Sequence, residues 1–187
     1  MGFIKTFGIL ATIAATASAL PQGFVQRDAT TTASAPSSSS SASGGSGSGI
    51  QIVNNMDSTV YLWSTSNTGG AMQTLASGGG TYSEDWQTNS NGGGISIKMS
   101  TSESEDSVLQ FEYTQNGDTL FWDLSSINLD STSDFVSQGF QATPSDSSCK
   151  SATCSPGDSS CAETYQHPDD VDTNSCSLDS GFTLTLG

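Results

Sequence analysis

Basic residues are scarce in this chain of 187 residues. Four Lys and Arg stand against 19 Asp and Glu, and the formal net charge is −15. The stretch 50–187 is more acidic still, because it holds 18 of the carboxylates and two of the basic residues, a formal charge of −16. Such a surface repels nucleic acid and anionic membranes, so we expect neither as a partner.

Histidine is also nearly absent, since His167 is the only one. With one histidine and no C-x-x-C pair, a zinc site lacks its usual ligands, and a serine nucleophile lacks its G-x-S-x-G turn. The glycine triplets at 78–80 and 92–94 are not followed by Lys-Ser or Lys-Thr, so they do not predict a phosphate-binding loop. We therefore expect no metal and no cofactor.

The surroundings of His167 need their own interpretation, because Asp169, Asp170 and Asp172 follow it closely. Pro and Asp are typical of turns, and Asp side chains bond nearby backbone N–H groups, which favours a structural loop. Two alternatives stay open. One is a hard-cation site on the aspartates, although the glycine and distal glutamate of an EF-hand loop are missing. The other is acid–base chemistry by His167.

The chain lacks any apolar run long enough to span a bilayer. Residues 1–19 combine Lys5, a short apolar stretch and a final Ala-Ser-Ala, which is the pattern of a secretory signal. Residues 20–49 predict a pro-segment and a disordered linker rich in Ser and Gly, since such a composition cannot bury enough surface to fold. The foldable part is 50–187, a single domain that we expect outside the cell or in the cell wall.

Sustained helical periodicity is missing, whereas apolar residues alternate with polar ones along several short runs. Examples are IQIVN, TVYLWS, ISIKMS, VLQFEY and the final FTLTL. Asn116-Gly117 between VLQFEY and TLFWDLS predicts a hairpin with a type I′ turn. Short alternating runs separated by Gly, Asn, Asp and Ser predict an all-β sandwich of antiparallel strands.

Cysteine occurs only near the C-terminal end, as Cys149, Cys154, Cys161 and Cys176. An exported protein meets an oxidising compartment, so two disulfides are expected. They would hold together a region that has few hydrophobic residues of its own. Four cysteines allow three pairings, and their spacing leaves the choice open.

Several segments resemble the thaumatin-like family, in the form of its small, secreted, antigenic fungal members. They are IQIVNNMDSTVYLWS, GGAMQTLASGGGTYSEDW, DTLFWDLSSINL and, most specifically, CAETYQHPDDVDTNSC. The last is similar to the family's C-P-x-A-Y-S-Y-P-x-D-D-x-T-S-T-F-x-C. The resemblance covers nearly all of 50–187. It implies a thaumatin-like β-sandwich with disulfide-stapled C-terminal loops, and the short SPGDSS replaces the second, cysteine-rich domain of larger members.

The resemblance also implies a disulfide pairing and an acidic cleft. The nested pairs Cys149–Cys176 and Cys154–Cys161 follow from the matching family positions. Asp123 matches one cleft carboxylate, whereas the cleft glutamate is replaced by Gln110, which cannot transfer a proton. Glu112, two residues further along the same strand face, is the geometric substitute.

The sequence gives three hypotheses for function. The first is a non-catalytic protein that binds β-1,3-glucan or another wall polysaccharide, as a monomer, through Tyr61, Trp63, Trp86 and Asp123. Tyr82 and Trp122 are further aromatics, and either Trp122 or its neighbour Phe121 must face the core. The second is a surface adhesin or antigen that contacts a host cell-surface protein. The third is a weak endo-β-1,3-glucanase with Glu112 and Asp123 as its catalytic pair.

Overall fold

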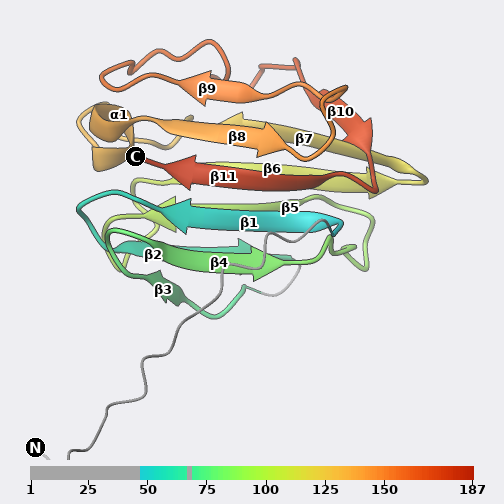
Figure 1. Cartoon of the computed structure of the whole chain (residues 1–187), viewed down its shortest axis with the longest axis horizontal. Helices are drawn as coiled ribbons and strands as arrows, with labels where there is room; N and C mark the ends of the chain where they lie inside the picture. Colours follow the sequence, from blue (N-terminus) through green and yellow to red (C-terminus); the bar gives the residue numbers. More distant parts are fainter. Residues whose placement is uncertain (1–46, 67–68) are drawn as a thin grey trace, which may run out of the picture. The chain divides into compact units, whose positions relative to one another are not determined.

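The computed structural model describes residues 47–66 and 69–187, and these form two β-sheets with one short helix. The predicted signal at 1–19 and the linker up to residue 46 lie outside the described residues. The five-stranded sheet has the order β4-β1-β11-β8-β9, and the six-stranded sheet has the order β10-β7-β6-β5-β2-β3 (Figure 1). The all-β prediction is confirmed. No helix in the described part of the chain is long and apolar enough to cross a membrane.

The strands have the following bounds. The five-stranded sheet contains β4 (Gly80–Glu84), β1 (Gly49–Asn54), β11 (Gly181–Leu186), β8 (Phe140–Pro144) and β9 (Ala152–Cys154). The six-stranded sheet contains β10 (Asn174–Ser177), β7 (Thr119–Ser125), β6 (Leu109–Asn116), β5 (Ile95–Ser100), β2 (Val60–Thr65) and β3 (Gln73–Leu75). The first strand thus begins one residue before the predicted domain start.

The two ends of the described domain meet in the five-stranded sheet. β1 pairs with β11 in parallel, with Ile50 opposite Phe182, and every other strand pair is antiparallel. A parallel pair needs a crossover, which the whole six-stranded sheet provides here. The position of the C-terminal strand therefore depends on the complete chain between the two strands.

The core lies between the sheets and follows the alternation read from the sequence. Leu109, Phe111 and Tyr113 of β6 are buried, as are Leu120, Trp122 and Leu124 of β7. Phe111 stacks on Trp122 at a centroid distance of 5.7 Å, and Phe182 of the opposite sheet lies 4.7 Å from Trp122. Aromatic side chains from both sheets thus fill the centre of the sandwich.

The hairpin between β6 and β7 is present, but its turn type differs from the prediction. Asn116 pairs with Thr119, so Gly117 and Asp118 form the two-residue loop. Gly117 has a φ of 60°, and no non-glycine residue in the described chain has a positive φ. A positive φ at the first loop position alone is the pattern of a type II′ turn, whereas type I′ requires it at both positions. The prediction of type I′ was wrong because the register places glycine first.

The structure contains the two nested disulfides that the family resemblance implies. Cys149 pairs with Cys176 at a Cα–Cα distance of 5.4 Å, and Cys154 pairs with Cys161 at 5.6 Å. Cys176 belongs to β10 of the six-stranded sheet, while Cys149 follows β8 of the other sheet. This bond therefore links the two layers at one end.

The one described helix is α1 (Asp134–Gln138), which connects β7 to β8. Ser133 caps it by accepting a hydrogen bond from the Val136 N–H, and Phe135 is buried in the core. This single short helix in the described part of the chain agrees with the absence of sustained helical periodicity in the sequence.

Candidate functional site

Glu112 and Asp123 lie side by side on the outer face of the six-stranded sheet. They are directly opposed partners in the β6–β7 pair. Phe111, Tyr113 and Trp122 point into the core. Side chains alternate between the two faces of a strand, so the neighbouring Glu112 and Asp123 point outward. Directly opposed antiparallel residues have Cβ atoms about 4.5–5.5 Å apart. The fold therefore brings the two carboxylates that the sequence suggested as a pair close together.

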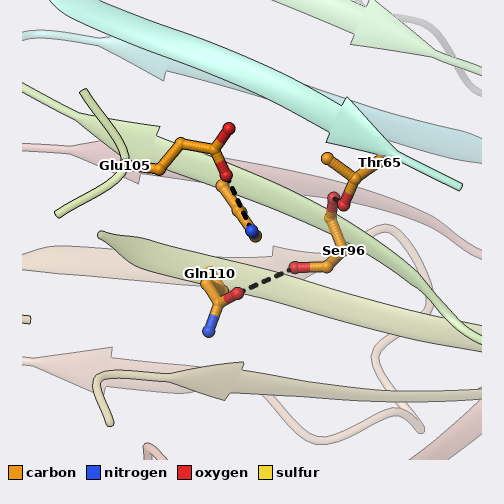
Figure 2. A network of polar contacts seen from close by, with 5 residues as sticks. Thr65, Ser96, Glu105 and Gln110 are labelled. Atoms are coloured by element: carbon orange, nitrogen blue, oxygen red, sulfur yellow. Dashed lines mark hydrogen bonds and ion pairs between the residues drawn. The ribbon is translucent and has the colours of Figure 1, made fainter. Parts of the chain in front are cut away.

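Polar side chains extend this pair across neighbouring strands. The β2–β5 and β5–β6 registers place Thr65 opposite Ser96 and Ser96 opposite Glu112. The Thr65 hydroxyl donates to the Ser96 carbonyl at 2.8 Å, and the Ser96 hydroxyl donates to Oε1 of Gln110 at 3.1 Å (Figure 2). Gln110 is thus held as a neutral member of this network in the place of the family's cleft glutamate.

The two lysines near this face, Lys98 and Lys150, are both paired with other carboxylates, and Lys150 binds Glu163 at 3.0 Å. Lys98 of β5 forms an ion pair with Glu105 at 2.7 Å (Figure 2). Lys98 pairs with Gln110 of β6, which lies two residues before Glu112 on the same strand. Lys98 therefore does not neutralise the Glu112–Asp123 pair through a salt bridge.

Two hollows adjoin at Asp123. One, of about 490 Å³, is lined by Thr65, Ser96, Glu112, Phe121 and Asp123, together with Ser66, Gly94, Ile95, Tyr113, Thr114 and Thr173. The other, of about 380 Å³, is lined by Asp123, Leu124 and Lys150 and by residues of the disulfide-bracketed loop. Asp123 contributes to both hollows, which we call together the acidic groove.

The loop between Cys161 and Cys176 forms one wall of this groove. The Tyr165 N–H donates to the Leu124 carbonyl at 2.8 Å, and the Tyr165 carbonyl accepts from the Ser126 N–H at 2.9 Å. The Gln166 amide also donates to the Ser126 hydroxyl at 2.7 Å. These bonds attach the loop beside the end of β7, and the disulfides hold its ends.

His167 has the role of a turn residue in this wall. Its backbone N–H donates to Oδ2 of Asp170 at 2.9 Å, and that oxygen also accepts from the Gln166 N–H at 2.7 Å. These two donors lower the pKa of the Asp170 carboxyl. Within the described chain, no three His, Cys, Asp or Glu side chains converge as metal ligands. The geometry supports the structural-loop interpretation.

Burial controls the electrostatics of the groove. Burial, together with the smaller effect of the neighbouring Glu112 charge, raises the pKa of the Asp123 carboxyl to about 7. Burial also raises the pKa of Glu112, while Ser96 and Lys98 oppose part of that change. Oδ1 of Asp123 is shielded from solvent and accepts no hydrogen bond from the described residues. Near neutral pH the Asp123 carboxyl is thus present in both its protonated and its charged form.

Asp123 should make the protein less stable as the pH rises. Its pKa lies above the ordinary value of 3.8, so its protonated form favours the folded state, and this contribution is lost between about pH 4 and pH 7. Because about a third of the group reaches solvent, we expect Asp123→Asn to exceed the wild type in unfolding free energy by about 1–2 kcal/mol at pH 8. Urea unfolding at pH 4, 6 and 8 measures this, with the exposed Asp169→Asn as control. A gain of the same size at every pH would refute the linkage.

Of the two tryptophans that the sequence suggested as ligand contacts, Trp63 is buried and Trp86 is half-buried against the core. Trp86 lies 4.8 Å from Tyr113 and 6.1 Å from Phe182 by ring centroids, and its Nε1 donates to the Ser180 carbonyl at 3.1 Å. Trp63 is 9% exposed, and Trp122 is fully buried. Trp63 is thus shielded from solvent, Trp86 packs against the core with part of its side chain exposed, and neither lines the two hollows.

The remaining aromatic side chains have different surroundings, and one of them lines the groove. Tyr61 is half-buried and lines neither hollow, and Tyr82 donates to Glu84 at 2.7 Å. Phe121, which the sequence analysis did not select as a ligand contact, is 38% exposed and lines the larger hollow beside Asp123. The alternation with Trp122 is the signal that identifies it, once Trp122 is assigned to the core.

The architecture and the site together define a class of protein. A β-sandwich with a parallel pairing of first and last strands, nested disulfides and an acidic groove beside the disulfide-bracketed loop is thaumatin-like. The larger members' cysteine-rich second domain has no counterpart in the described chain.

Comparison with known proteins agrees with this class. The family model described as Blastomyces yeast-phase-specific protein matches residues 35–187. A secreted thaumatin-like protein of Emericella nidulans is 48% identical over 187 residues, covering 100% of this chain and 98% of the relative. An antigenic thaumatin-like protein of Arthroderma benhamiae is 37% identical over 136 residues, covering 72% of this chain and 68% of the relative. The chain belongs to this family of small, secreted fungal thaumatin-like proteins.

A solved structure shares the fold. The crystal structure of the protein elicitor MoHrip2 from Magnaporthe oryzae superposes with a TM-score of 0.61 at 26% identity, covering 74% of this chain and 97% of the other. The thaumatin-like fold is confirmed, and with its secreted relatives this chain is a secreted protein.

Proposed function

We propose that this secreted thaumatin-like protein binds a chain of a neutral wall polysaccharide, β-1,3-glucan, in the acidic groove without cleaving it. The observation that carries the proposal is the juxtaposition at Asp123. A partly buried carboxyl with an unpartnered oxygen lies beside the exposed ring of Phe121 in a hollow lined by hydroxyl groups.

The chemistry of the groove suits a sugar. An aromatic ring offers a flat apolar surface for the C–H face of a pyranose, and carboxylates and hydroxyls bond its OH groups. Glu112 and Asp123 supply acceptors, and the Asp123 proton supplies a donor at mildly acidic pH. Small-molecule sites usually enclose about 300–1,000 Å³, and the larger hollow, of about 490 Å³, falls in that range.

A weak endo-β-1,3-glucanase is the second candidate, because one specific observation favours it. Glu112 and Asp123 are directly opposed register partners, a position that suits two cooperating carboxyls, and the raised pKa of Asp123 suits a general acid. However, both carboxyls stand on one face of one sheet. They would approach a sugar from the same side, whereas a retaining pair flanks the scissile bond. Binding is therefore favoured over cleavage.

Substitution of the groove carboxylate should weaken glucan binding. We expect Asp123→Asn to reduce the affinity for laminarin about tenfold at pH 7, because a hydrogen bond to a charged group contributes about 1.5–3 kcal/mol and the amide retains part of it. Phe121→Ala should have a comparable effect through lost stacking. Titration calorimetry measures both, with Asp169→Asn as a control on the loop outside the groove lining.

The same samples distinguish the alternatives when released reducing ends are assayed. Binding without reducing ends supports the proposal. Reducing ends that disappear in both Glu112→Gln and Asp123→Asn would show the glucanase instead. A wild-type protein that does not bind laminarin contradicts the proposal and favours the surface adhesin, which the name of the antigenic Arthroderma relative suggests.

A further inference from the structure

The outer face of the five-stranded sheet carries no charged side chain. The alternation of buried residues along its strands defines which positions point outward, since Ile50, Ile52, Ala142, Phe182 and Leu184 are buried. The outward positions of these five strands, all within the described chain, are Gly49, Gln51, Val53, Thr81, Ser83, Gln141, Thr143, Thr153, Gly181, Thr183 and Thr185. We call this surface the threonine face.

The strand registers arrange these residues in rows across the sheet. One row runs Ser83, Gln51, Thr183, Thr143, and the next runs Thr81, Val53, Thr185, Gln141, Thr153. Neighbouring strands lie about 4.8 Å apart and alternate residues along a strand about 6.8 Å apart. The result is a regular grid of hydroxyls and amides. In Figure 1 no described strand or helix lies in front of this sheet.

Most polar groups on the face are available to a partner. Gln141 donates to the Thr153 hydroxyl at 3.0 Å, and this is the one hydrogen bond between side chains of the face among the described residues. The paired glycines Gly49 and Gly181 leave a hollow of about 340 Å³ at one end, beside Gln51, Ser83 and Thr183. Glu84 and Asp85 border that hollow, so the acidic surface resumes at its rim.

We propose that the threonine face docks onto the surface of an insoluble, uncharged polysaccharide whose chains lie side by side. This site is separate from the acidic groove, which lies on the opposite sheet and which we propose to bind a single glucan chain. The face contacts many sugar hydroxyls at once through Thr, Ser and Gln groups that both donate and accept hydrogen bonds. The two sheets thus serve different forms of the same class of ligand.

The negative charge of the domain favours an uncharged polysaccharide as the partner of this face. Residues 50–187 carry a formal charge of −16, so a broad uncharged surface laid almost anywhere on the domain would have to desolvate carboxylates, which is costly. The threonine face avoids that cost. A second copy of this chain fits less well, since stable homodimer interfaces are more apolar and Val53 is the one large apolar side chain on the face.

Adsorption to microcrystalline chitin tests the proposal with charge variants of both signs. The exposed Thr143 ends the first row of the face, next to Thr183. We expect Thr143→Glu and Thr143→Lys each to lower the partition coefficient of the secreted protein at least fivefold, because either charge must be desolvated on docking. The matched control is Thr74→Glu, on exposed β3 of the other sheet, and it should change adsorption less than twofold.

Each outcome decides for or against the threonine face. Loss of adsorption with both signs, with laminarin binding unchanged, supports it. It is overturned if the wild type does not adsorb or if neither variant weakens adsorption. It is also overturned if Thr143→Lys adsorbs like the wild type while Thr143→Glu does not. A wild-type dimer in sedimentation velocity that Thr143→Glu dissociates would also overturn it, in favour of self-association.

Thr153→Glu, exposed on β9, repeats the test should Thr143→Glu fail to fold. Failure of the groove proposal would be seen separately, as a wild-type protein that does not bind laminarin.

Discussion

Replacing the half-buried Trp86 by alanine is expected to lower the free energy of unfolding by about 3 kcal/mol, the lower end of the range for an aromatic side chain packed in a core. The indole packs on Tyr113 and Phe182 and stacks at 6.3 Å on Phe111, so its removal leaves a cavity between the sheets. It also leaves the Ser180 carbonyl without its indole donor. Urea unfolding followed by far-ultraviolet circular dichroism measures the loss.

The control separates packing from ligand contact. Trp86→Phe keeps most of the buried volume, and we expect it to recover more than half of the lost stability. Both variants should bind laminarin with wild-type affinity under conditions where they are folded. Normal stability combined with lost binding would show that Trp86 contacts the ligand, as the sequence first suggested.

Removing the disulfide between Cys149 and Cys176 is expected to cost about 2–5 kcal/mol, the usual range for a native disulfide in a small secreted domain. The bond closes a loop with a sequence separation of 27 and links β10 to the segment after β8. Without it, the wall of the acidic groove is anchored mainly by hydrogen bonds around Tyr165 and Gln166. The double variant Cys149→Ser with Cys176→Ser, measured by urea unfolding, tests this.

The second disulfide provides the comparison. Cys154 and Cys161 have a sequence separation of 7, so the chain-entropy model assigns their bond about 1 kcal/mol less. We therefore expect the matched Cys154→Ser, Cys161→Ser variant to be the more stable of the two. The opposite order would show that native packing around the short loop, and not loop closure, determines the contribution of these bonds.

Local alternation was sufficient to predict β1, β2, β5, β6, β7 and β11 and much of their burial, whereas it did not predict the remaining, mostly shorter strands. VLQFEY and TLFWDLS became β6 and β7, and the residues placed on the inner face of β6 are buried. The disulfide pairing came from the family resemblance alone, because spacing left three choices open. The Asn-Gly signal located the hairpin but not its register, because a loop of Asn116 and Gly117 would have paired Glu112 with Phe121 instead of Asp123.

Other features depend on contacts between distant segments, and a local pattern cannot predict them. Trp86 follows β4 outside any strand, so alternation gives no direction for its side chain, and Phe182 and Ser180 near the C-terminus determine its burial. The role of Phe121 becomes visible only when Trp122 is known to face Phe111 and Phe182. The threonine face combines five separate strands, and its rows exist only once the sheet order is known.

The central claim is that the acidic groove holds a glucan chain, and the most direct measurement is an NMR titration of the ¹⁵N-labelled protein with a soluble β-1,3-glucan oligosaccharide. The account predicts saturable shifts at the amides of Ser96, Glu112, Phe121, Asp123 and Thr173, with no release of reducing ends. Asp123→Asn should weaken the same shifts. Saturable shifts elsewhere, or none at saturating oligosaccharide, would contradict it.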